Sequence, residues 1–199
     1  SYTQNGRSTF PFQLIPEAMD PAQLPPVDII LILNRNENII PAVAKLTREQ
    51  AAAYFMLGET KGTSAGGVEE AGKALRVPGT NPFFPLLHGA QGNRFLDLAN
   101  KLPFEAYLMN TGWVGGADGS VHSKKVKIRH SSAVVQAIAE QSISWTRDKT
   151  FGYQIADSVP GYQNGDHVLL QPEVYYKATE RQDEYEAIVS SLKGSRVQH

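Results

Sequence analysis

The sequence predicts an α/β domain with a mixed sheet and flanking helices. Two short apolar runs, Val27–Leu33 and Ala106–Met109, are typical of strands buried on both faces. Segments with helical spacing of apolar residues lie between and after these runs, and such alternation is typical of the α/β class. We expect residues 1–199 to form a single domain that ends in a helical region over residues 173–199.

The first part of the chain predicts an extended segment, a strand and a helix. Residues 1–26 contain several prolines, which favours an extended segment with turns over a helix. The apolar run then predicts a strand over residues 28–33. Thr47–Gln50 has the form of a capping box, which predicts a helix over residues 47–58 that Gly58 ends.

The middle of the chain predicts a loop, two helices and a second strand. Residues 59–67 are rich in Gly, Ser and Thr, so we expect a flexible loop there. A short helix is expected within residues 69–75. Apolar residues at near-helical spacing predict a helix over residues 93–102, and the second apolar run predicts a strand over residues 105–109.

The last part of the chain predicts a half-exposed strand and two helices. Residues 125–128 alternate polar and apolar side chains, as a half-exposed strand does. Ser131 or Ser132 is expected to cap a helix over residues 131–141. A surface helix with one buried stripe is expected over residues 180–193.

The composition excludes several classes of protein. A hydrophobic fraction of 41% and a charged fraction of 20% are ordinary for a globular protein. The formal net charge of -1 gives no global field that attracts nucleic acid or an anionic membrane. The chain has no cysteine, which removes disulfides and thiolate chemistry. With no apolar run as long as a membrane span and no signal-peptide pattern, we expect a cytoplasmic protein.

Gly58–Gly67 is the most suggestive motif. Backbone amides of a Gly-rich loop can converge on a phosphate group, and Lys61 would add positive charge. The order of residues departs from a Walker loop, because Lys61 is followed by Gly62 where a Ser or Thr would hold magnesium. The motif alone therefore favours a mobile surface loop over a phosphate site.

Asn110–Gly116 directly follows a predicted strand. Ligands of open α/β sheets bind beyond the carboxyl ends of strands, which makes this segment a candidate binding turn. An ordinary strand-end turn with a half-buried Trp113 explains the same residues equally well. Both interpretations stay open at this point.

A basic patch comes next in the sequence. It could contact an anion or a nucleotide, although such patterns more often mark solvated surface cations. Its members are Lys124, Lys125, Lys127, Arg129 and His130. The five histidines of the chain include no pair at ligand spacing beside a carboxylate, so we expect no metal site within this chain.

Several segments resemble, in the same order, the C-terminal part of ATP-dependent phosphoenolpyruvate carboxykinases. Tyr107–Gly116 resembles the family's strand that ends in Asn-Thr-Gly-Trp and glycines. Tyr2–Arg7 resembles its Thr-Glu-Asn-Thr-Arg, and Pro41–Thr47 resembles its Pro-Pro-Val-Ser-Lys-Leu-Thr. Phe55–Gly58 resembles its Phe-Leu-Ser-Gly, and Val159–Gly161 resembles a late Leu-Pro-Gly turn.

The resemblance, which extends over residues 2–172, implies a fold and an activity. The family converts oxaloacetate and ATP to phosphoenolpyruvate, ADP and carbon dioxide, with Mg²⁺ and a transition metal such as Mn²⁺. This is a decarboxylation to an enolate followed by phosphoryl transfer, which needs positioned cations and little covalent help from the protein. The resemblance thus implies a mononucleotide-binding fold, with ATP and oxaloacetate or phosphoenolpyruvate as ligands.

The resemblance also implies roles for individual residues. Arg7 matches the arginine that reaches the transferring phosphoryl group, and is the implied catalytic residue. Lys125 and Ser131 match an Arg and a Thr beside the adenine, and are the implied nucleotide-binding residues. The implied lid, which closes over bound nucleotide, consists of Thr60, Lys61, Gly62, Thr63, Ser64, Ala65, Gly66 and Gly67.

The sequence departs from the family pattern at two of these places. The lid has Thr-Lys-Gly-Thr-Ser-Ala-Gly-Gly where the usual pattern is Thr-Ala-Lys-x-Ala-Gly-Thr-Glu. Lys125 replaces a planar Arg, and Ser131 lacks the methyl group of Thr. The departures leave open whether the nucleotide preference or the activity is changed.

The family's phosphate-binding loop, metal ligands and oxaloacetate-binding arginine lie upstream of the segment that Tyr2–Arg7 resembles. We therefore expect a C-terminal fragment of a longer enzyme, inactive alone, whose partner is the N-terminal remainder of the same enzyme. Neither nucleic acid nor a membrane is an expected partner. The alternatives are a stand-alone, non-catalytic module that binds a nucleotide or an anion, and a structural domain that binds no nucleotide.

Overall fold

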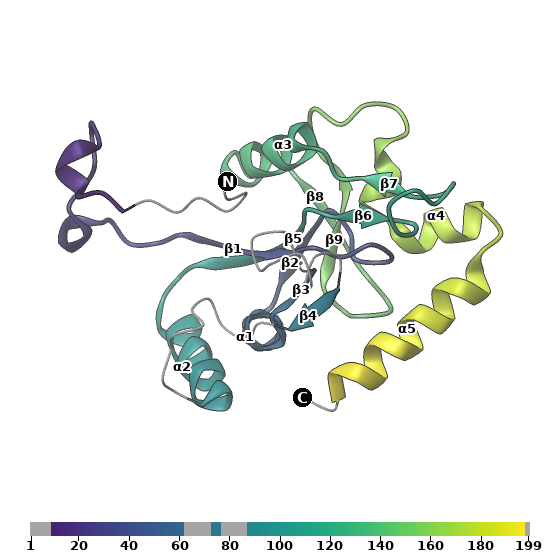
Figure 1. Cartoon of the computed structure of the whole chain (residues 1–199), viewed down its shortest axis with the longest axis horizontal. Helices are drawn as coiled ribbons and strands as arrows, with labels where there is room; N and C mark the ends of the chain where they lie inside the picture. Colours follow the sequence, from purple (N-terminus) through teal and green to yellow (C-terminus); the bar gives the residue numbers. More distant parts are fainter. Residues whose placement is uncertain (1–8, 62–72, 77–86, 198–199) are drawn as a thin grey trace, which may run out of the picture.

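A five-stranded sheet lies at the centre of the molecule (Figure 1). The computed structural model describes residues 9–61, 73–76 and 87–197. The strands of the sheet are β1 (Ile29–Asn34), β2 (Val43–Leu46), β5 (Glu105–Asn110), β8 (Ser144–Arg147) and β9 (Gln154–Ser158). They lie in the order β1-β5-β2-β9-β8, with β1 and β5 parallel and the other neighbours antiparallel. The predicted mixed α/β class is confirmed.

Both strands that the apolar runs predict are present. The strand expected over residues 28–33 is β1, and the strand expected over residues 105–109 is β5. β5 is largely buried, but the expectation that the first strand is buried on both faces is wrong, because β1 lies at the edge of the described sheet and Leu33 is 65% exposed. β2, β8 and β9, each only four or five residues long, are not among the predicted elements.

Helices cover both faces of the sheet. They are α1 (Arg48–Leu57), α2 (His88–Lys101) and α3 (Ile128–Ala139). α3 lies on one side of the sheet, where Val134 belongs to the same core as Tyr107, and α1 and α2 lie on the other side, where Ala51 belongs to the same core as Leu108 (Figure 1). Because successive side chains of a strand point to opposite faces, Tyr107 and Leu108 belong to separate cores, one on each face of the sheet.

α1 begins and ends as the sequence predicts. The Thr47 hydroxyl accepts a hydrogen bond from the Gln50 backbone N–H at 3.2 Å, and the Gln50 side chain accepts one from the Thr47 backbone N–H at 3.0 Å. The expected capping box is therefore confirmed. Gly58 ends the helix with a φ of 51°, a left-handed conformation that glycine adopts without strain.

α2 begins earlier than the sequence predicts. It runs from His88, whereas the periodicity predicts a helix over residues 93–102. Gly89 and Gly92 weaken the local helical signal of the first turns. Gly92 lies directly against α1, because a Cβ built there would be 2.6 Å from the Cγ atom of Met56. The close packing of α1 and α2 thus explains why position 92 is a glycine, although glycine has a low helix propensity.

A small two-stranded sheet follows α1. β3 (Glu59–Lys61) pairs antiparallel with β4 (Ala74–Arg76). The flexible loop expected over residues 59–67 is therefore wrong at residues 59–61, and the helix expected within residues 69–75 is wrong at residues 74–75. Pairing between separated residues leaves no local pattern in the sequence. Residues 62–67 and 69–72 lie outside the described ranges.

A second small sheet follows β5. β6 (Trp113–Val114) pairs antiparallel with β7 (Lys124–Lys125). The strand expected over residues 125–128 is wrong beyond Lys125, because α3 begins at Ile128. The helix expected over residues 131–141 is present as α3, with an earlier start.

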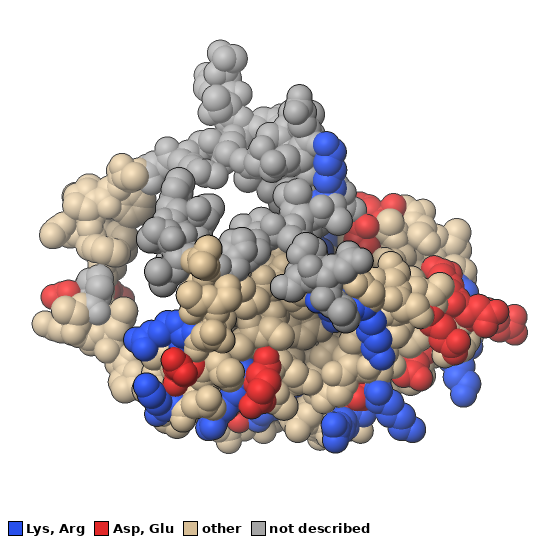
Figure 2. Space-filling model, turned by 90° about the horizontal axis from the view of Figure 1, so that it is seen from below, with Lys and Arg blue, Asp and Glu red and all other residues tan. Residues whose placement is uncertain are grey.

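Two helices follow the 3-10 turn η4 (Asp166–Leu169). They are α4 (Pro172–Ala178) and α5 (Gln182–Val197). α5 confirms the helix expected over residues 180–193, and its predicted apolar stripe packs in a third core. The buried members of that core are Ile39, Tyr176 and Tyr185, and the partly buried side chains packed against them are Phe151, Ile188, Val189 and Leu192. Acidic side chains gather at one end of the face drawn in Figure 2, the end where Figure 1 places the junction of α4 and α5.

The described part of the leading segment forms an exposed arm (Figure 1). It contains two 3-10 turns, η1 (Phe12–Leu14) and η2 (Pro21–Gln23), and a further turn in which the Ala18 N–H donates to the Ile15 carbonyl. Phe12 is 60% exposed and Leu14 is 70% exposed, so this apolar arm contributes little to the core. None of the helices in the described part of the chain is long and apolar enough to cross a membrane.

Candidate functional site

The carboxyl ends of the parallel strands β1 and β5 lie side by side. The register pairs Asn34 with Asn110 at these ends. In α/β sheets, ligands bind beyond the carboxyl ends of parallel strands. The candidate site is therefore the turn Asn110–Trp113 after β5, together with the β6–β7 hairpin and the start of α3.

The Asn110 side chain builds this turn. It is completely buried. Its Oδ1 atom accepts hydrogen bonds from the backbone N–H of Asn36 at 3.0 Å and of Gly112 at 2.8 Å. Its Nδ2 group donates to the carbonyls of Ile40 at 2.9 Å and Trp113 at 3.1 Å. Because both atoms of the amide are fully engaged, Asn110 holds the loops and does not bind a ligand.

Gly112 allows the loops after β1 and β5 to meet. A Cβ at this position would lie 2.1 Å from the backbone oxygen of Asn36, which real Cβ atoms do not approach. The same oxygen accepts a hydrogen bond from the Trp113 backbone N–H at 2.7 Å. The two strand ends are thus locked together by backbone contacts that only glycine permits.

Lys125, the implied nucleotide contact, lies at this turn. Its Nζ donates to the Thr111 carbonyl at 3.4 Å and lies 5.0 Å from the centroid of the half-buried Trp113 ring. Burial lowers the pKa of Lys125, and the positive charge of Arg35 lowers it further. An ammonium has three donors and the structure assigns one to Thr111, so the group can also donate to an anion or a base.

Ser131, the second implied nucleotide contact, is half-buried in the first turn of α3. The predicted cap at Ser131 or Ser132 is wrong, because the helix already starts at Ile128. His130 completes the helix start instead: its Nδ1 atom accepts a hydrogen bond from the Lys127 backbone N–H at 3.0 Å. A histidine here does what Glu or Gln does in a capping box, and the sequence pattern does not reveal it.

Asp166 fixes the same end of α3. Its carboxylate lies 2.9 and 3.0 Å from the two terminal nitrogens of Arg129, and it accepts the Gln163 backbone N–H at 2.9 Å. Burial raises the pKa of Asp166, but the Gln163 amide and Arg129 outweigh it and lower the pKa. The pKa of His130 is lowered, first by burial and then by Arg129. The predicted basic patch is therefore weaker than its sequence indicates, since Arg129 is paired with Asp166 and the pKa of His130 is lowered.

The buried imidazole of His130 predicts a loss of stability in mild acid. Its pKa is lowered in the folded chain, so the unfolded chain binds the proton more readily. The stability that this group supplies is complete above the unfolded pKa of about 6.5 and falls as the pH drops below it. We expect His130→Gln, which retains an acceptor for the Lys127 N–H, to flatten the change in thermal midpoint between pH 7.5 and pH 5.5. An unchanged slope in the variant would contradict this assignment.

The other predicted site residues lie elsewhere or outside the described ranges. Thr60 and Lys61 belong to β3, in a different sheet from Lys125. Arg7 and Gly62–Gly67 lie outside the described residues. Within the described ranges, no group of three or more His, Asp or Glu side chains could hold a metal ion.

The sequence analysis also does not identify Asn36, a residue of the loop after β1 that supports the turn. Asn36 supplies a backbone donor to Asn110 and a backbone acceptor to Trp113, although it lies far from both in the chain. No local signal could have found it, because its contribution comes from the main chain and not from its residue type.

The fold and this turn define a mixed α/β domain with a candidate site beyond the ends of its parallel strands. The chain belongs to the phosphoenolpyruvate carboxykinase family, whose family model matches residues 1–165. The family that the sequence resembles is therefore confirmed.

Curated relatives carry the name phosphoenolpyruvate carboxykinase (ATP). The protein from Rhizobium meliloti is 33% identical over 179 residues, which cover 86% of this chain and 32% of the relative. The protein from Sinorhizobium fredii has the same identity and coverage. The protein from Bradyrhizobium diazoefficiens is 28% identical over 98% of this chain and 36% of the relative. The chain thus spans about a third of the length of these relatives.

Proposed function

We propose that this chain is the C-terminal, nucleotide-binding part of an ATP-dependent phosphoenolpyruvate carboxykinase, and that it is inactive without the N-terminal remainder of that enzyme. The observation that carries the proposal is the family match over residues 1–165, combined with relatives named for the ATP-dependent enzyme that are about three times as long. The proposed reaction converts oxaloacetate and ATP to phosphoenolpyruvate, ADP and carbon dioxide.

The proposed roles of this part are nucleotide binding and charge stabilisation. Lys125 and Ser131 lie on consecutive elements, β7 and α3, and we assign them to the adenine side of bound ATP. Arg7 would donate to the transferring phosphoryl group, because a guanidinium fork matches its oxygens. Residues 60–67 are the proposed lid. ATP supplies the phosphoryl group when bound.

The described residues do not fit the metal ions that the family uses. No cluster of three His, Asp or Glu side chains occurs among them. We therefore assign the ligands of Mg²⁺ and Mn²⁺ to the N-terminal remainder and derive no step through these ions in this chain.

The free edge of β1 is the proposed contact surface for that remainder. Among the described strands, β1 ends the sheet and has β5 as its neighbour. Leu33 on this strand is 65% exposed, and Val27 just before it is 61% exposed. An apolar edge strand with unpaired backbone groups is a template for pairing with another segment.

A chimeric enzyme tests the proposed function. This chain would replace the matched third of the Rhizobium meliloti carboxykinase, with the unaltered enzyme as control. We expect the chimera to form phosphoenolpyruvate from oxaloacetate and ATP, and the isolated chain to form none. In the chimera, Arg7→Lys should lower kcat at least about tenfold and change the KM for ATP little, because the fork acts on transition-state charge.

Two results would contradict the proposal. A folded chimera that forms no product would remove the carboxykinase assignment. Tight binding of magnesium-ATP by the isolated chain, measured by calorimetry, would favour the stand-alone nucleotide-binding module instead.

A further inference from the structure

α5, together with the residue directly before it, contacts both of the small sheets. Lys125, a proposed nucleotide contact, belongs to one of these sheets, and Thr60 and Lys61 of the proposed lid belong to the other. Arg181, directly before the helix, contacts Gly115 at the end of β6. Arg196, in its last turn, contacts Glu59 at the start of β3. With 16 residues the helix is about 24 Å long, so it joins segments that are well separated.

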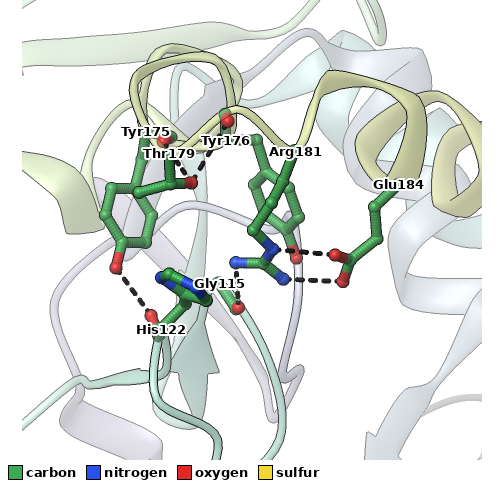
Figure 3. Close-up of polar contacts among 7 residues, drawn as sticks. All are labelled: Gly115, His122, Tyr175, Tyr176, Thr179, Arg181 and Glu184. Atoms are coloured by element: carbon green, nitrogen blue, oxygen red, sulfur yellow. Dashed lines mark hydrogen bonds and ion pairs between the residues drawn. The ribbon is translucent and has the colours of Figure 1, made fainter.

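The first contact is a network around the Arg181 guanidinium (Figure 3). One nitrogen donates to the Gly115 carbonyl at 2.9 Å. The other two donate to the Glu184 carboxylate at 2.7 and 2.6 Å, and the planar group lies 4.4 Å from the Tyr176 ring centroid. Glu184 raises the pKa of Arg181, and Arg181 lowers the pKa of Glu184. All the nitrogens of the guanidinium are thus engaged, which fixes its direction.

Tyr175, in α4, makes further contacts with the β6–β7 hairpin. Its hydroxyl donates to the His122 carbonyl at 2.7 Å (Figure 3). Its ring also lies against Gly115, where a Cβ would be 2.6 Å from the Tyr175 Cε1 atom and where φ is 87°. The loop that joins β6 to β7 is therefore held near its beginning and near its end. Lys125 follows three residues after His122.

The second contact is a largely buried ion pair. The Arg196 guanidinium donates to both carboxylate oxygens of Glu59, at 2.8 and 2.7 Å, and the two side chains are only 14% and 12% exposed. The guanidinium also lies 5.1 Å from the Tyr54 ring centroid and 5.3 Å from that of Phe151. A bidentate pair between aromatic rings allows one geometry, so it fixes the start of β3 against the end of α5. Thr60 and Lys61 come directly after Glu59.

We propose that Arg181 and Arg196 are positioning residues, and that α5 is a brace that fixes the β6–β7 hairpin and the start of β3 relative to each other. The functional meaning rests on the proposed function, because it assigns Lys125 to one braced segment and Thr60 and Lys61 to the other. The family match ends at residue 165, so the whole brace lies beyond the matched segment. A pre-organised geometry of binding groups requires such support from outside the site.

Hydrogen exchange of the chain itself tests the brace. Arg196→Gln should quicken exchange at residues 59–61 about tenfold, and Arg181→Gln should do the same at residues 113–125, with exchange in the α3 segment 131–139 unchanged. Arg196→Lys should restore part of the protection, because it keeps the charge and loses the fork. Lys177→Gln removes a positive charge from an exposed position of α4, outside both contacts, and serves as the control.

The chimeric carboxykinase gives the second measurement. Arg196→Gln should raise the KM for ATP about threefold or more while kcat changes less, whereas a purely structural role would lower only the yield of folded enzyme. Unchanged exchange at residues 59–61 and 113–125 would overturn the brace. Equal quickening along the whole chain would overturn it too. An inactive chimera would remove the proposed function, and the exchange data would still decide whether α5 braces the two segments.

Discussion

Replacing Asn110 by Ala is expected to destabilise the protein by about 4 kcal/mol or more, because this completely buried side chain makes four hydrogen bonds that are lost together. The substitution leaves the N–H groups of Asn36 and Gly112 without an acceptor, and the carbonyls of Ile40 and Trp113 without a donor. Urea denaturation followed by circular dichroism measures the loss. Asn93→Ala, at an exposed position of α2, is the matched control and should change stability little.

The pH dependence of Asn110→Asp separates the donor from the acceptor of this amide. The aspartate can still accept from Asn36 and Gly112, but its second oxygen then faces the two carbonyls. That repulsion raises the pKa of the introduced acid above the unfolded value of about 3.9. Stability is then greatest at low pH and falls as the pH rises through the raised pKa. Equal stability of this variant at pH 5 and pH 7.5 would contradict the assigned network.

Gly112→Ala is expected to cost about 3 kcal/mol or more, because overpacking against main-chain atoms cannot be relieved by a rotamer change. The new Cβ would lie 2.1 Å from the Asn36 oxygen, so the loops after β1 and β5 would have to separate. Gly194→Ala in α5 is the control, since nothing lies within 4 Å of its Cβ position. The control should stabilise the protein by about 0.5–1 kcal/mol. Similar effects at both glycines would show that the two loops are not locked.

The elements that the sequence predicts well carry their signal locally. β1 and β5 are continuous apolar runs, α1 has a capping box, and α5 has a stripe at spacings of three and four. β3 and β4 are not predicted because each has only three residues and its partner strand is distant in the sequence. The early start of α3 is not predicted, because His130 stands where a capping box usually has Glu or Gln.

The candidate site likewise contains residues that the sequence reveals and residues that it does not reveal. Asn110–Gly116 stands out in the sequence because a strand ends there in small and polar residues. The support of that turn does not stand out, because Arg181 reaches Gly115 across 66 positions of the chain. The support of β3 does not stand out either, because Arg196 reaches Glu59 across 137 positions. Such contacts depend on how the elements pack, which no window of sequence contains.

The parallel pairing of β1 with β5 also has a consequence for how the chain folds. Ile29 pairs with Glu105, so the two strands meet only after a long loop closes, and closing such a loop is slow. The hairpin of β8 and β9 needs far less chain, since Trp145 pairs with Ala156. The hairpin therefore forms early and the β1 side of the sheet late. We therefore expect an interval in which β1 is apolar and unpaired, so that aggregation competes with refolding more strongly as the protein concentration rises.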